Sequence, residues 1–101
     1  MAAKKNSAKK IHVLVTTELR GVFMGLLDPA TIDDDVLELE AARLCIYWSA
    51  DVKGFMGLAT SGPTASCRIG PPANIRLRKI SSVLTVTPVA VAAWDAAPWG
   101  K

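Results

Sequence analysis

One short motif, Phe-Met-Gly-Leu, occurs twice in this sequence, at residues 23–26 and again at residues 55–58. A basic residue and a glycine precede each copy, as Arg-Gly at residues 20–21 and as Lys-Gly at residues 53–54. Each copy also follows an apolar, strand-like run and a polar turn, which is the pattern of a β-hairpin. We therefore predict two similar hairpins, related by duplication of one unit. A chance match over a few residues is the alternative.

The first predicted hairpin begins with the β-branched residues Ile11, Val13 and Val15, which alternate along a strand. Its second strand covers residues 22–27, where Gly25 suggests a bulge or a close approach of another backbone. In the second hairpin, residues 44–48 are apolar almost without alternation, which favours a central strand. Residues 55–60 are predicted to return as its partner strand.

The remainder of the chain predicts further strands and one helix. Residues 61–66 read as a loop, and short strands are expected at 67–69, 74–79 and 81–86. Thr87-Pro88 is typical of a helix start, because a hydroxyl cap precedes proline at the first helical position. We expect a mainly β (α+β) fold: a small curled sheet or barrel built from the two hairpins and one or two further strands, with a C-terminal helix over 88–97.

Composition points to one domain that self-associates. The chain has 101 residues, of which 50% are apolar and 21% charged, and a small monomer covers that much apolar surface poorly. We expect a homo-oligomer. Four of the twelve basic residues lie within residues 1–10, so the remaining chain holds eight basic and nine acidic residues. We predict a disordered basic tail over 1–10 and a single β-rich domain over 11–101.

The residue types needed for catalysis or metal binding are sparse. The chain has one histidine, His12, and two cysteines, Cys45 and Cys67, without metal-ligand spacing. The acidic run over 31–40, a short helix or a loop, lacks the glycine and terminal glutamate of a calcium loop. We expect a non-enzymatic protein without metal or cofactor. No apolar run approaches a membrane span and no signal peptide is evident, so a cytoplasmic protein is expected.

The strongest candidate for a binding site is the polar loop after the second predicted hairpin. Residues 60–68 concentrate hydroxyls, a glycine and an arginine, and exposed amides with hydroxyls can hold an anion. Basic residues of the two repeated turns would add charge, and an aromatic ring would offer a stacking face. An ordinary loop has a similar composition. The predicted ligand-binding residues are Arg20, Trp48, Lys53, Thr60, Ser61, Gly62, Thr64, Ser66 and Arg68.

Two stretches carry a resemblance to a known group of proteins. The segment 44–70, Leu-Cys-Ile-Tyr-Trp through Cys-Arg-Ile-Gly, and the segment 91–99, Val-Ala-Ala-Trp-Asp-Ala-Ala-Pro-Trp, resemble a family of small uncharacterised phage and prophage proteins. The resemblance implies a viral origin and an accessory role in the host cytoplasm. It implies no substrate.

We therefore expect a phage accessory protein that captures a small anionic ligand, such as a cyclic nucleotide signal of host defence. Two other functions stay open. One is a protein–protein inhibitor of a host factor, or a virion or assembly component, using the apolar surface or the acidic residues 33–40. The other is a small-barrel nucleic-acid-binding protein that uses the lysine-rich tail and the basic residues Arg76, Arg78 and Lys79.

Overall fold

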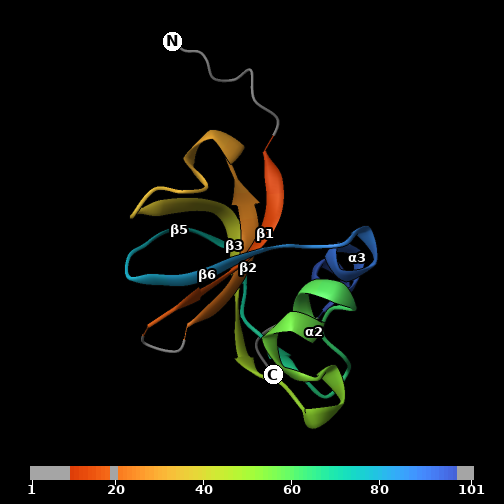
Figure 1. Ribbon diagram of the computed structural model, residues 1–101. Helices are drawn as coiled ribbons and strands as arrows, with labels where there is room; N and C mark the ends of the chain where they lie inside the picture. Colours follow the sequence, from red (N-terminus) through yellow and green to blue (C-terminus); the bar gives the residue numbers. More distant parts are fainter. Residues whose placement is uncertain (1–9, 19–20, 98–101) are drawn as a thin grey trace.

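An antiparallel sheet of six strands is the framework of the fold, and two helices lie beside it (Figure 1). The computed structural model describes residues 10–18 and 21–97. The strands are β1 (Ile11–Thr17), β2 (Val22–Leu27), β3 (Leu37–Tyr47), β4 (Arg68–Ile69), β5 (Ala73–Leu77) and β6 (Ile80–Thr85). The helices are α2 (Gly54–Thr60) and α3 (Pro88–Ala96), with short 3-10 turns η1 (Pro29–Thr31) and η2 (Ala50–Val52). The predicted mainly β class and the C-terminal helix are confirmed.

The long strand β3 organises the sheet. The strand order is β4-β3-β2-β1-β6, and β5 also pairs with β3. β3 carries an extra residue near Ala41, because Met24 pairs with Arg43 whereas Leu26 pairs with Glu40. Ala41 has a φ of 54°, and its N–H donates to the side-chain oxygen of Asn74 at 3.0 Å. This bulge bends β3, which crosses the molecule and then turns downward in Figure 1.

The predicted second hairpin is wrong, and so is a closed or strongly curled sheet. Residues 55–60 form helix α2 in place of a strand, so only β1 and β2 make a hairpin of the predicted kind. Lys53 and Gly54 both have positive φ, 64° and 79°, and this pair turns the chain sharply into the helix. A two-residue turn joins β5 and β6. However, β5 pairs with β3 and β6 pairs with β1 rather than with each other, so the sheet stays open between them.

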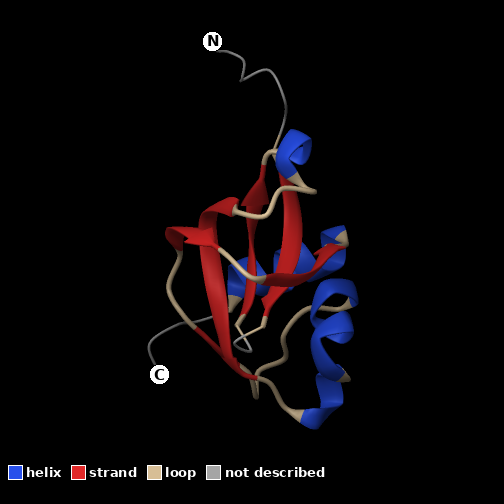
Figure 2. Cartoon of the chain, turned by 60° about the vertical axis from the view of Figure 1, so that its left-hand side comes forward, coloured by secondary structure: helices blue, strands red, loops and turns tan. Residues whose placement is uncertain are grey.

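A hydrophobic cluster lies on each face of the sheet. One hydrophobic cluster, the helix-side core, lies between the sheet and the two helices and contains Leu14, Met24, Leu58 and Trp94. The second cluster covers the other face and combines residues of β5 and β6 with those of β1 and β3. Strand β1 contributes to both clusters, because successive side chains point to opposite faces. In Figure 1 and Figure 2, α2 and α3 lie together beside the strands, whereas the short η1 turn lies apart from them.

Helix α3 is fixed at both ends. The Thr87 hydroxyl accepts a hydrogen bond from the Ala90 N–H at 3.1 Å, as predicted for the N-cap, and donates one to the Thr60 carbonyl at 2.6 Å. Near the other end, the buried Arg43 side chain donates to three carbonyl oxygens. They belong to Gly70 at 2.7 Å, Trp94 at 2.5 Å and Ala97 at 2.8 Å. A cation near a helix C-terminus is favourable, so Arg43 holds α3 to β3.

Two further predictions concern the basic tail and the absence of a membrane-spanning segment. The basic tail over 1–10 lies outside them except for Lys10, whose ammonium forms an ion pair with Glu40 at 2.7 Å. Within the described ranges, no helix has the length and apolar character needed to cross a bilayer. The radius of gyration is 13.1 Å.

Candidate functional site

A groove with an apolar floor and a basic rim lies where β5 ends above the β2–β3 pair. Its volume is about 710 Å³. The floor is apolar and comes from Phe23, Leu44, Ile46 and Leu77, and Cys45, whose side chain packs in the helix-side core, lines the groove between two of them. The rim contains the exposed Arg76, Arg78 and Lys79, and Thr17 and Gly21 also line the groove. We call this feature the basic-rimmed groove.

The floor exists because β3 extends beyond its main partners. Phe23 pairs with Leu44, and β3 then continues past the start of β2. Leu44 is 37% exposed and Ile46 61% exposed, so these side chains leave apolar surface facing water. A Cβ atom at Gly21 would lie 2.6 Å from the Phe23 ring. Glycine at this position therefore lets the aromatic ring lie against the turn.

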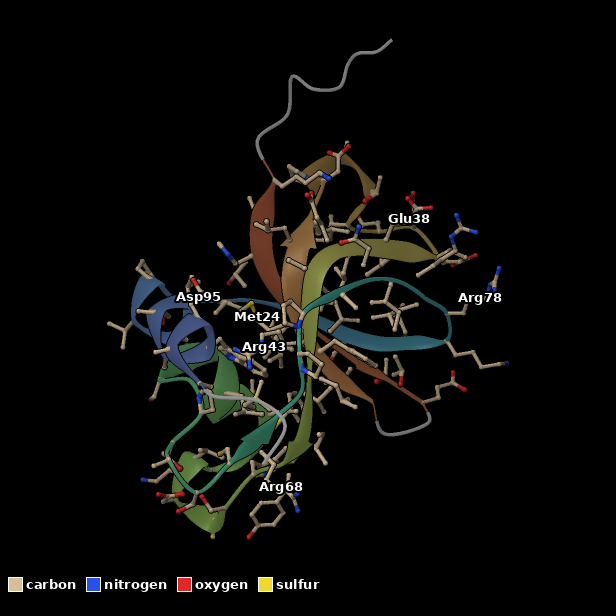
Figure 3. All side chains as sticks on the ribbon, turned by 180° about the vertical axis from the view of Figure 1, so that it is seen from behind. Met24, Glu38, Arg43, Arg68, Arg78 and Asp95 are labelled. Carbon is tan, nitrogen blue, oxygen red and sulfur yellow. The ribbon has the colours of Figure 1, made fainter. Side chains whose placement is uncertain are left out.

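The rim places positive charge directly beside that apolar surface. Arg76 is bound to Glu38, with Nε and Nη2 at 3.0 and 2.7 Å from one carboxylate oxygen. Arg78 and Lys79 form the β5–β6 turn, and Lys79 has a φ of 56°. Neither side chain forms an ion pair with any described residue. Figure 3 shows Arg78 at the periphery, on the same side of the molecule as Glu38.

The predicted loop site has a different character. Thr60 ends α2, and its hydroxyl donates to the Met56 carbonyl at 2.7 Å. Ser61 and Ser66 are exposed. Gly62 is buried with a φ of 85°, and a Cβ there would lie 2.6 Å from the Ala93 side chain. Gly62 therefore serves the contact between this loop and α3.

Thr64 connects the loop to an acidic side chain. Its hydroxyl donates to Asp51 at 3.4 Å and lies 3.3 Å from the Ser49 hydroxyl, which also donates to Asp51. An anion bound at Thr64 would therefore meet the Asp51 carboxylate. If this site is to hold phosphate, the positive charge that attracts it must come from residues other than Thr64, Ser49 and Asp51.

The other predicted site residues lie in several different elements. Arg68 is exposed and pairs with Tyr47 across β3 and β4. Trp48 is partly buried against the helix-side core, so its ring serves the packing there. Lys53 is exposed in its left-handed turn. Arg20 lies outside the described residues. The loop site remains a prediction.

The sequence contained part of the signal for the groove. Arg76 and Arg78 alternate with Leu77, so a basic face and a buried face were expected for this strand. The apolar floor was missed, because Leu44 and Ile46 were assigned to a central strand buried on both faces. The approach of the β5–β6 turn to the β2–β3 pair depends on the bend in β3, which sequence periodicity does not report.

The fold defines a small α+β domain built on an antiparallel sheet. Residues 10–94 match a family model described as "Domain of unknown function (DUF6948)", so the chain belongs to this family. No curated protein and no solved structure matches the chain significantly. The family match covers most of the chain and carries no statement of a viral origin.

Proposed function

We propose that this chain is a binding protein that captures a small organic anion in the basic-rimmed groove. The observation that carries the proposal is the position of an exposed apolar floor immediately beside the cations Arg78 and Lys79. A ligand with an apolar or aromatic part and at least one anionic group matches both features. The cyclic nucleotides expected from the sequence belong to this chemical class.

The energetics favour such a ligand over a simple ion. Covering Leu44 and Ile46 would remove apolar surface from water, at about 25 cal/mol per Å². Arg78 would bind a phosphate, sulfonate or carboxylate through two parallel N–H groups, and Lys79 would add a point charge. Inorganic phosphate would use the rim alone and should bind more weakly.

Isothermal titration tests the proposal with three kinds of probe. These are 1-anilinonaphthalene-8-sulfonate (ANS), which joins aromatic rings to an anion, a panel of cyclic dinucleotides and ADP-ribose derivatives, and inorganic phosphate. We expect ANS or a nucleotide to bind at least about tenfold more tightly than phosphate, because only they reach the apolar floor. No heat with any organic anion of the panel would contradict the proposal.

A matched pair of variants separates the groove from the loop. Arg78→Gln with Lys79→Gln removes two of the three rim charges and leaves Arg76 with its partner Glu38, whereas Lys53→Gln removes a charge of the predicted loop site. We expect the rim variant to lose about tenfold or more in affinity and Lys53→Gln to bind as the unaltered protein does. The reverse result would assign the anion to residues 60–68.

A homo-oligomeric, viral accessory protein in the host cytoplasm remains part of the proposal. Apolar side chains outside the groove support self-association, since Met56 is 64% and Val89 69% exposed. Native mass spectrometry of the purified protein checks this by reporting subunit number together with any retained small molecule. A monomer at micromolar concentration would remove the oligomeric part and leave anion capture untouched.

The two other functions expected from the sequence predict different results. A nucleic-acid-binding protein would lose affinity steeply with salt and would depend on the lysines of residues 1–10. A protein inhibitor of a host factor would bind a protein partner whether or not the groove is filled. Arg76, Arg78 and Lys79 on one rim favour the nucleic-acid alternative over the protein inhibitor.

A further inference from the structure

The two cysteines come together at the junction of β3 and β4. Both are free thiols, with Cys45 in β3 and Cys67 directly before β4. β4 joins β3 through the pairs Cys45–Ile69 and Tyr47–Arg68, so the segment holding Cys67 runs alongside the end of β3. Cys67 also packs against the helix-side core, of which Cys45 is a member.

The two sulfur atoms have different surroundings. Cys45 is buried, and its thiol donates to the Tyr47 carbonyl at 3.5 Å. Burial, with the neighbouring Cys67 as a second and smaller cause, raises the pKa of Cys45 to about 12. Cys67 is only partly buried, and its sulfur accepts a hydrogen bond from the Thr64 N–H at 3.4 Å. An oxidant therefore reaches Cys67 more readily than Cys45.

We propose that Cys45 and Cys67 form an oxidisable dithiol that a peroxide converts into an intramolecular disulfide. In the first step the Cys67 sulfur attacks the peroxide O–O bond, giving a sulfenic acid and releasing water from hydrogen peroxide. In the second step the Cys45 sulfur displaces the sulfenic hydroxyl, which leaves as water with the Cys45 proton. Two electrons pass from the two thiols to one peroxide.

This dithiol would regulate the groove, and that part rests on the proposed function. Cys45 lies between Leu44 and Ile46 in β3, and its own side chain packs in the helix-side core whereas these two neighbours line the groove on the opposite face. A bond to Cys67 would draw the end of β3 toward the 61–67 loop and change the position of both apolar neighbours. In cytosolic proteins, disulfides that form are usually transient and redox-sensing, which suits a reversible switch.

Intact-mass spectrometry after treatment with hydrogen peroxide tests the dithiol without any ligand. We expect the folded monomer to lose about 2 Da, to regain it with dithiothreitol, and to yield a Cys45–Cys67 cross-linked peptide on non-reducing digestion. The variant Cys45→Ser should instead accumulate a sulfenic acid at Cys67, which dimedone traps. Cys67→Ser should leave Cys45 unmodified under the same treatment.

Three outcomes would overturn the dithiol: only disulfides between chains, oxidation of Cys67 to sulfinic acid without the 2 Da loss, or no reaction before unfolding. Because the cross-linked peptide is sought in the unaltered protein, a variant that fails to fold leaves this test intact.

The regulatory step is tested by titrating ANS into reduced and oxidised protein. We expect at least about a threefold difference in affinity, and equal affinities would overturn regulation. If ANS and the nucleotides bind neither form while the disulfide still forms, the proposed function fails and the dithiol stands.

Discussion

The two Phe-Met-Gly-Leu segments fold into different structures. Residues 23–26 lie in β2 between two neighbouring strands, with Met24 buried and Phe23 paired to both Val15 and Leu44. Residues 55–58 lie in α2, where Met56 is 64% exposed and Leu58 fully buried. The same four residues therefore bury different side chains in the two places.

The difference lies in what surrounds each copy. β2 returns directly along β1 and gains hydrogen-bonding partners on both edges. The second copy follows the left-handed pair Lys53-Gly54, and Leu58 with Ala59 then lies on one helical face against the core. A four-residue match has no fixed conformation, because strand pairing and core burial outweigh local preference.

The largest expected effect on stability comes from replacing Arg43, which connects the two regions. Arg43 pairs with Met24 in the β2–β3 ladder, and its guanidinium holds helix α3, on which α2 packs. Arg43→Met would leave three carbonyl oxygens without their donor, so we expect a loss of about 4 kcal/mol in unfolding free energy. Urea denaturation measures it. The same change at the exposed Arg78 should alter stability by less than about 0.5 kcal/mol, and equal losses would contradict the role of Arg43.

The second-largest expected effect is at Gly57 in the helical copy of the motif, where a loss rather than a gain in stability would show how that helix packs. In an unconstrained helix, glycine to alanine stabilises by about 1 kcal/mol. At Gly57, however, an added Cβ would overlap the Val52 carbonyl oxygen. We therefore expect Gly57→Ala to destabilise the protein by about 3 kcal/mol, measured by thermal and urea unfolding. A gain in stability would mean that α2 does not pack on Val52 in this way.

The equivalent change in the strand copy should have a smaller effect. A Cβ at Gly25 would lie 3.0 Å from the Ala42 Cα and 3.1 Å from the Glu40 carbonyl oxygen, at the bulge of β3. Small shifts of β3 can relieve these contacts, so Gly25→Ala should cost about 1–2 kcal/mol in unfolding free energy. A loss as large as that at Gly57 would show that the two glycines are equally constrained.

The smallest expected effect is at Lys53, in the turn that precedes the helical copy of the motif. Lys53 has a φ of 64°, which is unfavourable for a residue with a Cβ, and its side chain is exposed. Replacing it with glycine relieves this strain, so Lys53→Gly should increase the free energy of unfolding by up to about 1 kcal/mol. The melting temperature should rise slightly as a result. The control Lys53→Ala removes the same side chain but keeps the Cβ, so it leaves the strain in place. A fall in melting temperature for Lys53→Gly would contradict the left-handed turn.

Local signals predicted the parts of the fold that depend on neighbouring residues. The alternation beginning at Ile11 gave β1, Thr87-Pro88 gave the start of α3, and Gly25 lies in the predicted close approach. Helix α2 was missed because seven residues are too few to show a helical period clearly. The groove was missed for a different reason, since it forms between strands that only the bend near Ala41 brings together.

We propose that a small organic anion binds in the basic-rimmed groove rather than at residues 60–68. Titration of ¹⁵N-labelled protein with ANS, followed by amide chemical shifts, tests it most directly. The expected result is a saturable set of shifts at Phe23, Leu44, Ile46 and Lys79 that weakens strongly in the Arg78→Gln, Lys79→Gln variant. Shifts centred on residues 60–68, or no saturable shifts at all, would contradict it.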